Sequence, residues 1–166
     1  QFFAGGIKDS KKLTPKKRNE ILTELIFLKK KKKIKFAYCH IASSHIDKNG
    51  ISASVIKGIK KVLAKVEVLP QACDVRLDGL LKAPAVFTNQ TTIIKGDERE
   101  CVIALASIVA KVSRDQLMRR LATKYPAYGF EQHKGYGTKR HYDLIRKHGL
   151  SAVHRRSYLP WPFFSS

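Results

Sequence analysis

Two aspartates follow two short runs of β-branched and apolar residues. Asp78 ends the run 74–79 just before a glycine, and Asp97 follows the run 91–95 and a glycine. Both runs predict strands, and ligands of α/β proteins gather at strand ends, where the loops converge. Carboxylates brought together there are suited to Mg²⁺ or Mn²⁺, which prefer oxygen ligands. Such ions can activate a water and stabilise the leaving oxygen of a phosphodiester, so the pair indicates metal-dependent hydrolysis.

Each aspartate also has a structural alternative. Asp78 precedes Gly79 and could begin a turn. Asp97 and Glu100 have the D-x-x-E spacing of a capping arrangement, so Asp97 could cap the helix that follows. On spacing alone, these alternatives and the metal-binding interpretation remain open.

The charge balance identifies the class of partner. Lys and Arg number 33 against 13 Asp and Glu, which gives a net charge of +20. A chain this basic attracts polyanions, so nucleic acid is the first candidate partner and an anionic membrane the second. Charge alone separates neither an enzyme from a binding module nor DNA from RNA.

Two further features bear on the cellular setting. The longest apolar stretch, 102–110, is far shorter than a membrane span, so we expect no membrane association. The three cysteines, Cys39, Cys73 and Cys101, are widely spaced and odd in number, which indicates reduced thiols. Reduced thiols favour the cytoplasm.

The elements that must position the aspartates alternate between helices and strands. Thr14 and the following proline predict a helix start, and helical spacing of apolar residues continues to a lysine run. Strands are expected at 35–41, 74–79 and 91–95. Helices are expected after Gly50, from about 98 to 124, and from Thr138 to about 148. A chain of 166 residues suits one domain, and the alternation predicts the α/β class.

The helix from about 98 to 124 has an unusually small-sided early part. Alanines and serines between 104 and 110 lie among larger apolar residues. Small side chains let a helix approach its neighbour closely, so we expect this part to pack against the sheet.

A series of short motifs resembles, in order, the landmarks of bacterial ribonuclease HII. No single motif is decisive, but together they cover nearly the whole chain, from Ile7 to about Pro160. They are Asp9-Ser10-Lys11-Lys12-Leu13-Thr14, Leu77-Asp78-Gly79, Lys95-Gly96-Asp97, the run from Ala104 to Asp115, Tyr128-Gly129-Phe130, His133-Lys134-Gly135-Tyr136-Gly137-Thr138 and His154-Arg155-Arg156-Ser157-Tyr158.

The resemblance implies a ribonuclease H-like sheet flanked by helices, with a C-terminal helical extension. It implies one domain over 1–166, of which about 126–166 forms the substrate-binding part. The implied activity is hydrolysis of the RNA strand of RNA–DNA hybrids and incision at ribonucleotides embedded in duplex DNA, by a two-metal mechanism with Mg²⁺ or Mn²⁺. Replication machinery is an implied partner, and a monomer is expected.

The family uses four carboxylates, and two of them fall on Asp78 and Asp97. The other two belong to a D-E-A-G-R-G motif, which occurs nowhere in these 166 residues. We expect that motif to precede Gln1, on a first central strand that this sequence lacks. The chain as given is therefore expected to be inactive.

The resemblance also implies a nucleic-acid-binding set. Tyr136 corresponds to the family tyrosine that packs on the sugar at the RNA–DNA junction, although a loop aromatic covering the core is the alternative. Ser10, Lys11 and Lys12 resemble the family's backbone-binding loop, and Lys134 is a further candidate. Hydroxyl and ammonium groups hold phosphates without reading sequence. Each lysine is about as well explained as a solvated surface charge.

Some alternatives remain after the resemblance. The chain could be a truncated or inactive homologue that acts only as a basic nucleic-acid-binding module, or a basic ribosome-associated protein. His133, His141 and His154 could titrate near neutrality. Nothing in the sequence gives these histidines a catalytic role, so they are interpreted as structural or phosphate-facing.

Overall fold

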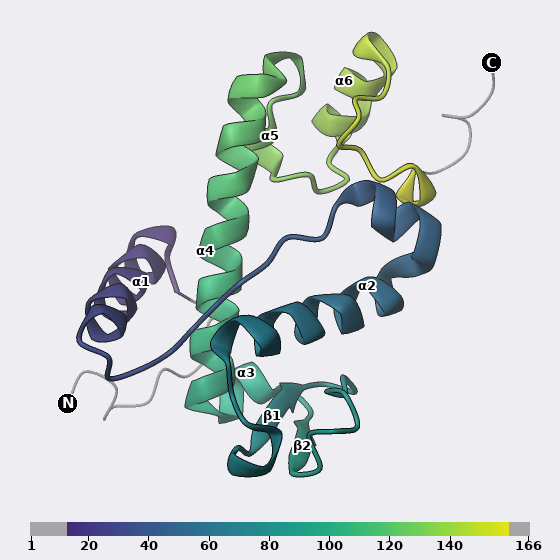
Figure 1. The fold of residues 1–166 in the computed structure, drawn as a ribbon. Coiled ribbons are helices and arrows are strands. Elements are labelled where there is room, and N and C mark those ends of the chain that lie inside the picture. Colours follow the sequence, from purple (N-terminus) through teal and green to yellow (C-terminus); the bar gives the residue numbers. More distant parts are fainter. Residues whose placement is uncertain (1–12, 160–166) are drawn as a thin grey trace. The chain divides into compact units, whose positions relative to one another are not determined.

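The structure is a computed structural model that describes residues 13–159 (Figure 1). Its contacts group the chain into two compact units. The first unit comprises Gln1–Cys39 and Val55–Val112, and the second comprises His40–Ser54 and Ser113–Ser166. The single domain predicted for 1–166, with a substrate-binding part from about residue 126, stays a prediction.

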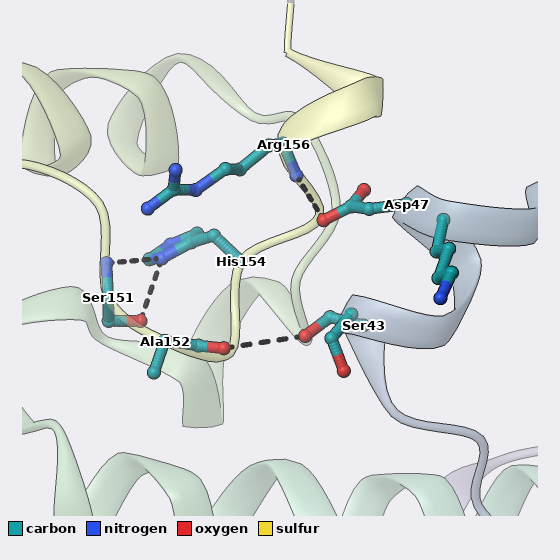
Figure 2. Close-up of a pocket in the computed structure, with 8 residues that line it drawn as sticks. Ser43, Asp47, Ser151, Ala152, His154 and Arg156 are labelled. Atoms are coloured by element: carbon teal, nitrogen blue, oxygen red, sulfur yellow. Dashed lines mark hydrogen bonds between the residues drawn. The ribbon is translucent and has the colours of Figure 1, made fainter.

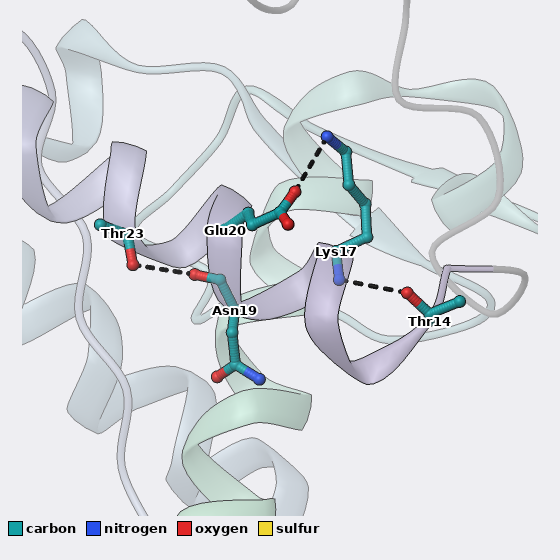
Figure 3. Close-up of polar contacts among 5 residues, drawn as sticks. All are labelled: Thr14, Lys17, Asn19, Glu20 and Thr23. Atoms are coloured by element: carbon teal, nitrogen blue, oxygen red, sulfur yellow. Dashed lines mark hydrogen bonds and ion pairs between the residues drawn. The ribbon is translucent and has the colours of Figure 1, made fainter.

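Helix α1, Pro15–Lys30, begins where the sequence predicts. The Thr14 hydroxyl oxygen accepts a hydrogen bond from the backbone N–H of Lys17 at 3.2 Å, and proline occupies the first turn (Figure 3). This arrangement satisfies one of the donors that a helix start leaves open. On the exposed side, Lys17 forms an ion pair with Glu20 at 3.2 Å. The capping pattern therefore fixes the start of α1.

The apolar side of α1 packs against helix α4, Cys101–Lys124. Ile21 and Leu25 of α1 form a buried cluster with three α4 side chains, Ile108, Val109 and Val112. Ala104 of α4 is fully buried as well, as expected of a small-sided helix surface. The sequence predicts this surface against the sheet, but in the described residues α1 completes the cluster.

The described sheet consists of two parallel strands, β1 (Val75–Asp78) and β2 (Gln90–Ile93), with Asp78 opposite Ile93. Both strands were predicted, and the fold is α/β. Leu77 of β1 is buried with Ala83 and Phe87, and apolar residues of α2 (Ser43–Val66) pack against them. A short 3₁₀ turn, η1 (Pro70–Ala72), precedes β1.

The strand predicted at 35–41 is wrong, because this segment is not part of a sheet. Two of its carbonyls accept hydrogen bonds from lysine side chains instead. Lys29 Nζ donates to Phe36 O at 2.9 Å, and Lys65 Nζ donates to Tyr38 O at 3.2 Å. A strand needs a neighbouring strand to complete its ladder, and no described strand lies against this segment.

Two of the predicted helices are interrupted. Helix α2 starts at Ser43, before the predicted start, and Gly50 breaks its geometry with φ 78° and ψ 169°. The helix expected from about 98 is divided into α3 (Gly96–Arg99) and α4, with extended backbone at Glu100. The predicted end at Lys124 is confirmed.

The second unit ends in short helices, which form the predicted C-terminal helical part. These are η2 (Pro126–Tyr128), α5 (Phe130–His133), α6 (Lys139–His148) and η3 (Arg156–Tyr158). Thr138 caps α6 by accepting from the His141 N–H at 3.3 Å, and Gly149 follows its end with φ 74°, both as predicted. No described helix combines the length and apolar character needed to cross a bilayer.

Candidate functional site

Asp78 is held at the end of β1 by the start of α3. The Gly96 N–H donates a hydrogen bond to Asp78 Oδ1 at 2.8 Å, and the Gly79 N–H donates to Ile93 O at 3.0 Å. Asp97 directly follows Gly96 and is the second residue of α3. The structure therefore brings the two predicted aspartates to the same end of the sheet.

The close approach at this point requires glycine at position 96. A Cβ there would lie 2.6 Å from Ile103 Cδ1 and 3.4 Å from Asp78 Oδ1. The first distance is shorter than real contacts between carbon atoms, so a side chain at position 96 would push Ile103 or the turn away. Gly96 thus lets α3 begin directly against the Asp78 carboxylate.

The two aspartates differ in exposure. Asp78 is exposed, whereas Asp97 is only 4% exposed. A buried carboxylate is costly in free energy unless hydrogen bonds or a cation compensate its charge. One open and one enclosed carboxylate, both with hard oxygen donors, suit a divalent cation such as Mg²⁺ or Mn²⁺.

The structural alternatives for the aspartates stay open, and a turn does begin directly after Asp78. The Asp78 carboxylate bonds to Gly96 and not within its own turn. The N-cap position of α3 belongs to Lys95, which has φ 55°, and Asp97 lies inside the helix. Asp78 nevertheless has a structural role, because its carboxylate anchors α3.

Two carboxylates are an incomplete ligand set. Within the part of the chain that the structure describes, no group of three or more His, Cys, Asp or Glu residues is placed to hold an ion. Asp78 and Asp97 fit as ligands by donor type and position, and their metal-binding role stays a prediction.

The predicted tyrosine lies on an exposed loop of the second unit. Its side chain is 61% exposed, so Tyr136 does not cover the core. The guanidinium of Arg114 lies 5.4 Å from the ring centroid, and Arg114 Nη2 donates to Lys134 O at 3.1 Å. Lys134 and Gly135 both have positive φ, 52° and 77°, which turns the loop sharply. Tyr136 therefore presents an exposed ring with the Arg114 guanidinium beside it.

Arg114 is the residue of this loop that sequence reasoning missed. It lies on α4, in the run from Ala104 to Asp115 that the resemblance covers, and no binding role was inferred for it from that run. The contact with Lys134 joins residues 20 positions apart. Only the fold reveals that Arg114 lies against the Tyr136 ring.

Three buried histidines lie beneath this loop. His133 and His141 stack with ring centroids 4.0 Å apart, and His141 Nε2 lies 3.1 Å from His154 Nε2. Tyr128 and Phe130 also stack, at 5.5 Å, and Phe130 contacts all three histidines. Of the two interpretations made from sequence, burial supports the structural one.

The environment keeps the inner histidines neutral. Burial, followed by the neighbouring His141, lowers the pKa of His154 from 6.5 to about 4. Burial also lowers the pKa of His141. Neutral rings carry no charge for a phosphate, so the basic character of this unit comes from its lysines and arginines.

A pocket of about 420 Å³ is lined in part by His154 (Figure 2). Asp47 anchors its rim, because the N–H groups of Arg156 and Ser157 each donate to its carboxylate at 3.0 Å. Burial alone would raise the pKa of Asp47, but the hydrogen bonds from Ser157 and Arg156 lower it overall. The lining residues are Ser43, Ser44, Asp47, Lys48, Ser151, Ala152, His154 and Arg156.

This pocket had no signal in the sequence, because its two sides are about a hundred residues apart. Of the remaining predicted residues, Lys134 is placed in the loop beside Tyr136. Ser10, Lys11 and Lys12 lie outside the described residues.

The family model described as Ribonuclease HII matches residues 1–160. The chain belongs to the ribonuclease HII family. The resemblance seen in the motifs is thereby confirmed. Family membership identifies a hydrolytic nuclease of a class that depends on divalent metal ions.

Curated ribonuclease HII proteins support the assignment. The chain is 42% identical to the ribonuclease HII of Caldicellulosiruptor bescii over 154 residues, which is 93% of this chain and 71% of that protein. It is 40% identical to the Bacillus anthracis ribonuclease HII over 159 residues, which is 96% of this chain and 59% of that protein.

Solved structures of ribonuclease HII share the fold. A ribonuclease H2 from Pyrococcus horikoshii aligns with a TM-score of 0.64 at 21% identity, covering 92% of this chain and 77% of that one. The ribonuclease HII of a PCNA complex from Archaeoglobus fulgidus also aligns with a TM-score of 0.64 at 21% identity, covering 93% and 79%. These likenesses bear on the α/β fold alone.

Proposed function

We propose that the ribonuclease HII enzyme to which this chain contributes Asp78 and Asp97 hydrolyses the RNA strand of RNA–DNA hybrids and incises duplex DNA at embedded ribonucleotides. The 166 residues, which include two of the four carboxylates that the family uses, are proposed to be inactive on their own. Asp78 and Asp97 are the proposed ligands of Mg²⁺ or Mn²⁺. The observation that carries the proposal is the hydrogen bond from the Gly96 N–H to Asp78 Oδ1, which brings Asp97 to the same strand end.

The proposed roles of the aspartates follow from their surroundings. Bound divalent ions, two in the proposed mechanism, would supply water activation and neutralise charge on the scissile phosphate. Because the backbone holds one oxygen of Asp78, the carboxylate is oriented and its second oxygen is the one offered to a cation. Burial of Asp97 limits its motion and keeps its charge from being screened by water.

The proposed substrate contacts lie in the second unit. The exposed Tyr136 ring suits packing on a sugar, and complements contacts that sense the 2′-hydroxyl. The Arg114 guanidinium lies over the ring and Lys134 lies two residues before it in the loop, and both are proposed to contact phosphates. Ser10, Lys11 and Lys12 are proposed to bind the backbone as well. Such binding weakens with salt and is indifferent to sequence.

The alternative is a homologue that only binds nucleic acid. The net charge of +20 supports binding without chemistry, and the described residues supply only two of the carboxylates that the family uses. Metal-dependent cleavage of DNA that holds one ribonucleotide separates the two functions. A protein that binds this substrate and never cuts it, with either metal, is the binding module.

The sharpest test of the site is Asp78→Asn in the full-length enzyme. The asparagine oxygen still accepts the Gly96 N–H, so the variant removes charge and keeps the anchoring bond. We expect cleavage to fall by at least about 100-fold, because charge stabilisation by a bound ion is worth several kcal/mol. Hybrid binding in a gel-shift assay should persist.

The matched control for this test is Asp74→Asn. Asp74 precedes the opposite end of the same strand and pairs with Arg76 on the surface at 3.0 Å. The cleavage rate of Asp74→Asn should match that of the unaltered enzyme. If Asp78→Asn turns over as fast as this control, Asp78 is not a metal ligand.

Three broader features are also proposed for this chain. They are a monomeric state, a cytoplasmic location and an association with replication machinery. The last is supported by one fold neighbour, whose structure is a PCNA:RNase HII complex.

A further inference from the structure

The two innermost histidines form a hydrogen-bonded chain with one consistent direction. At its first end, the backbone N–H of Ser151 donates to His154 Nδ1 at 3.0 Å. The Ser151 hydroxyl lies 2.8 Å from the same nitrogen and can donate or accept, whereas the backbone N–H can only donate, so His154 Nδ1 carries no proton. The neutral His154 ring must therefore carry its proton on Nε2.

The second end of the chain imposes the complementary arrangement. His141 Nδ1 lies 2.9 Å from the carbonyl oxygen of Tyr136, which can only accept. His141 Nδ1 is therefore the protonated nitrogen, and its Nε2 accepts from His154 Nε2 at 3.1 Å. Both ends specify the same neutral tautomers, and every ring nitrogen of the pair has a partner.

The backbone around Tyr136 is held from the other side too. The Gly135 N–H donates to His133 Nδ1 at 3.1 Å, and His133 Nε2 lies 2.6 Å from Tyr128 O. A Cβ at Gly135 would lie 3.1 Å from Met118 Cε, so this backbone is packed closely against α4. The backbone on both sides of the exposed ring is thus fixed by buried groups.

From this geometry we infer that His141 and His154 are positioning residues for Tyr136. His141 donates to the Tyr136 carbonyl, which also accepts from the Thr138 N–H at 2.9 Å, and His154 holds His141 in the tautomer that can donate. The ring itself makes no contact that would confine it in a core, because 61% of it is exposed. Its placement depends on its backbone. This inference rests on the proposed function, since the contact of Tyr136 with the sugar is itself proposed.

Simple packing does not explain the pair. Two buried rings that carry four polar nitrogens are costly to desolvate, and apolar residues of the same volume would fill the space without that cost. The hydrogen bonds offset the cost only when both tautomers are correct. The pair therefore favours the backbone position in which the Tyr136 carbonyl accepts from His141.

The test compares two substitutions of one residue in the full-length enzyme. In His141→Asn, the side-chain amide reaches the position of Nδ1 and can still donate to the Tyr136 carbonyl. In His141→Gln, the amide reaches the position of Nε2, so the contact with His154 is kept and the bond to Tyr136 is lost. Both variants remove the imidazole, and glutamine is closer to histidine in volume than asparagine is, so a role in packing alone predicts that His141→Gln performs at least as well as His141→Asn.

We expect His141→Gln to incise DNA with one embedded ribonucleotide with a kcat/KM roughly tenfold or more below that of His141→Asn, as misplacement of a binding group would cause. Amide hydrogen exchange of residues 134–138 should be faster in His141→Gln than in His141→Asn. Equal incision and equal exchange in the two variants would overturn the inference.

The unaltered protein provides a test that does not depend on either variant folding. Ring ¹⁵N NMR should show His141 protonated at Nδ1 and His154 protonated at Nε2 at neutral pH, and any other pair of tautomers overturns the inference. If Tyr136→Ala incises normally, the proposed role of Tyr136 fails. Hydrogen exchange and the tautomers still decide whether the histidines position the loop.

Discussion

The strand end that carries Asp78 and Asp97 differs from the loop that carries Tyr136 in what the fold must hold in place. At the strand end, a charged side chain is the functional group, and a single backbone N–H, that of Gly96, orients it. In the loop, the functional group is an exposed ring, and buried histidines hold its backbone.

The difference concerns which changes each region tolerates. Removing a charge should disable the strand end without unfolding it, because an amide keeps the anchoring bond. The loop carries no essential charge at Tyr136, so it should respond to changes in shape and tautomer. Four substitutions or conditions test this contrast.

The largest effect is expected from Asp97→Asn, which keeps the shape of the side chain and removes its charge. Cleavage in the presence of Mg²⁺ or Mn²⁺ should fall by at least about 100-fold. The circular dichroism spectrum should stay unchanged, since a buried amide is easier to desolvate than a buried carboxylate. A variant that cleaves at the normal rate would show that the negative charge of Asp97 is not needed for cleavage.

Gly96→Ala should have the next largest effect, a loss of stability, because its methyl group would lie 2.6 Å from Ile103 Cδ1. The expected loss is about 1–3 kcal/mol of unfolding free energy, as for other overpacked sites, measured by urea denaturation. Ile103→Val removes the clashing atom, so the double variant should recover part of the loss. If the double variant is no more stable than Gly96→Ala, the clash is not the cause.

Tyr136→Ala should separate activity from stability in the second unit. Incision at an embedded ribonucleotide should fall roughly tenfold, because the sugar loses its aromatic partner. The unfolding free energy should change by only about 0.5 kcal/mol, since the side chain is exposed. Unfolding of the variant at room temperature would contradict the loop geometry described here.

The smallest effect is the pH dependence of thermal stability near neutrality. The pKa of His154 is about 4 in the folded protein against 6.5 for an ordinary histidine, so the unfolded chain binds more protons in this window. The contribution of neutral His154 is complete above about pH 6.5 and is lost as the pH falls toward 4. Melting curves between about pH 7 and pH 5 should show this decline.

The control for the pH series is His154→Gln, which cannot titrate. Its amide still reaches toward His141, so the local packing is retained in part. The decline in melting temperature should be shallower in this variant, because His154 no longer contributes and only the remaining histidines, His141 among them, and the carboxylates do. If the melting temperature falls equally with decreasing pH in both proteins, His154 is not held neutral.

Local signals predicted the elements that depend on short-range chemistry. Thr14 before a proline predicted the start of α1, and Thr138 with Gly149 predicted both ends of α6. The two strands that end near Asp78 and Asp97 were also predicted, since β-branched runs bounded by glycine need no distant information. Capping and turn preferences act within four residues, so the sequence carries them directly.

Elements that depend on a distant partner were predicted less well. The run 35–41 has the composition of a strand but lies against lysine side chains, because a strand exists only with a neighbour. The break at Glu100 and the packing of α4 on α1 were likewise missed. Each is decided by contacts between segments that are separated in the chain.

The sequence by itself determined the family, the caps, the two strands and the identity of the candidate residues. The tertiary structure alone decided that the Gly96 N–H holds the Asp78 carboxylate, that Arg114 borders the Tyr136 ring, and that two neutral histidines reach its backbone. The physical reason is range. Propensities and caps are properties of neighbouring residues, whereas a hydrogen bond across 13 or 18 positions exists only once packing has brought its ends together.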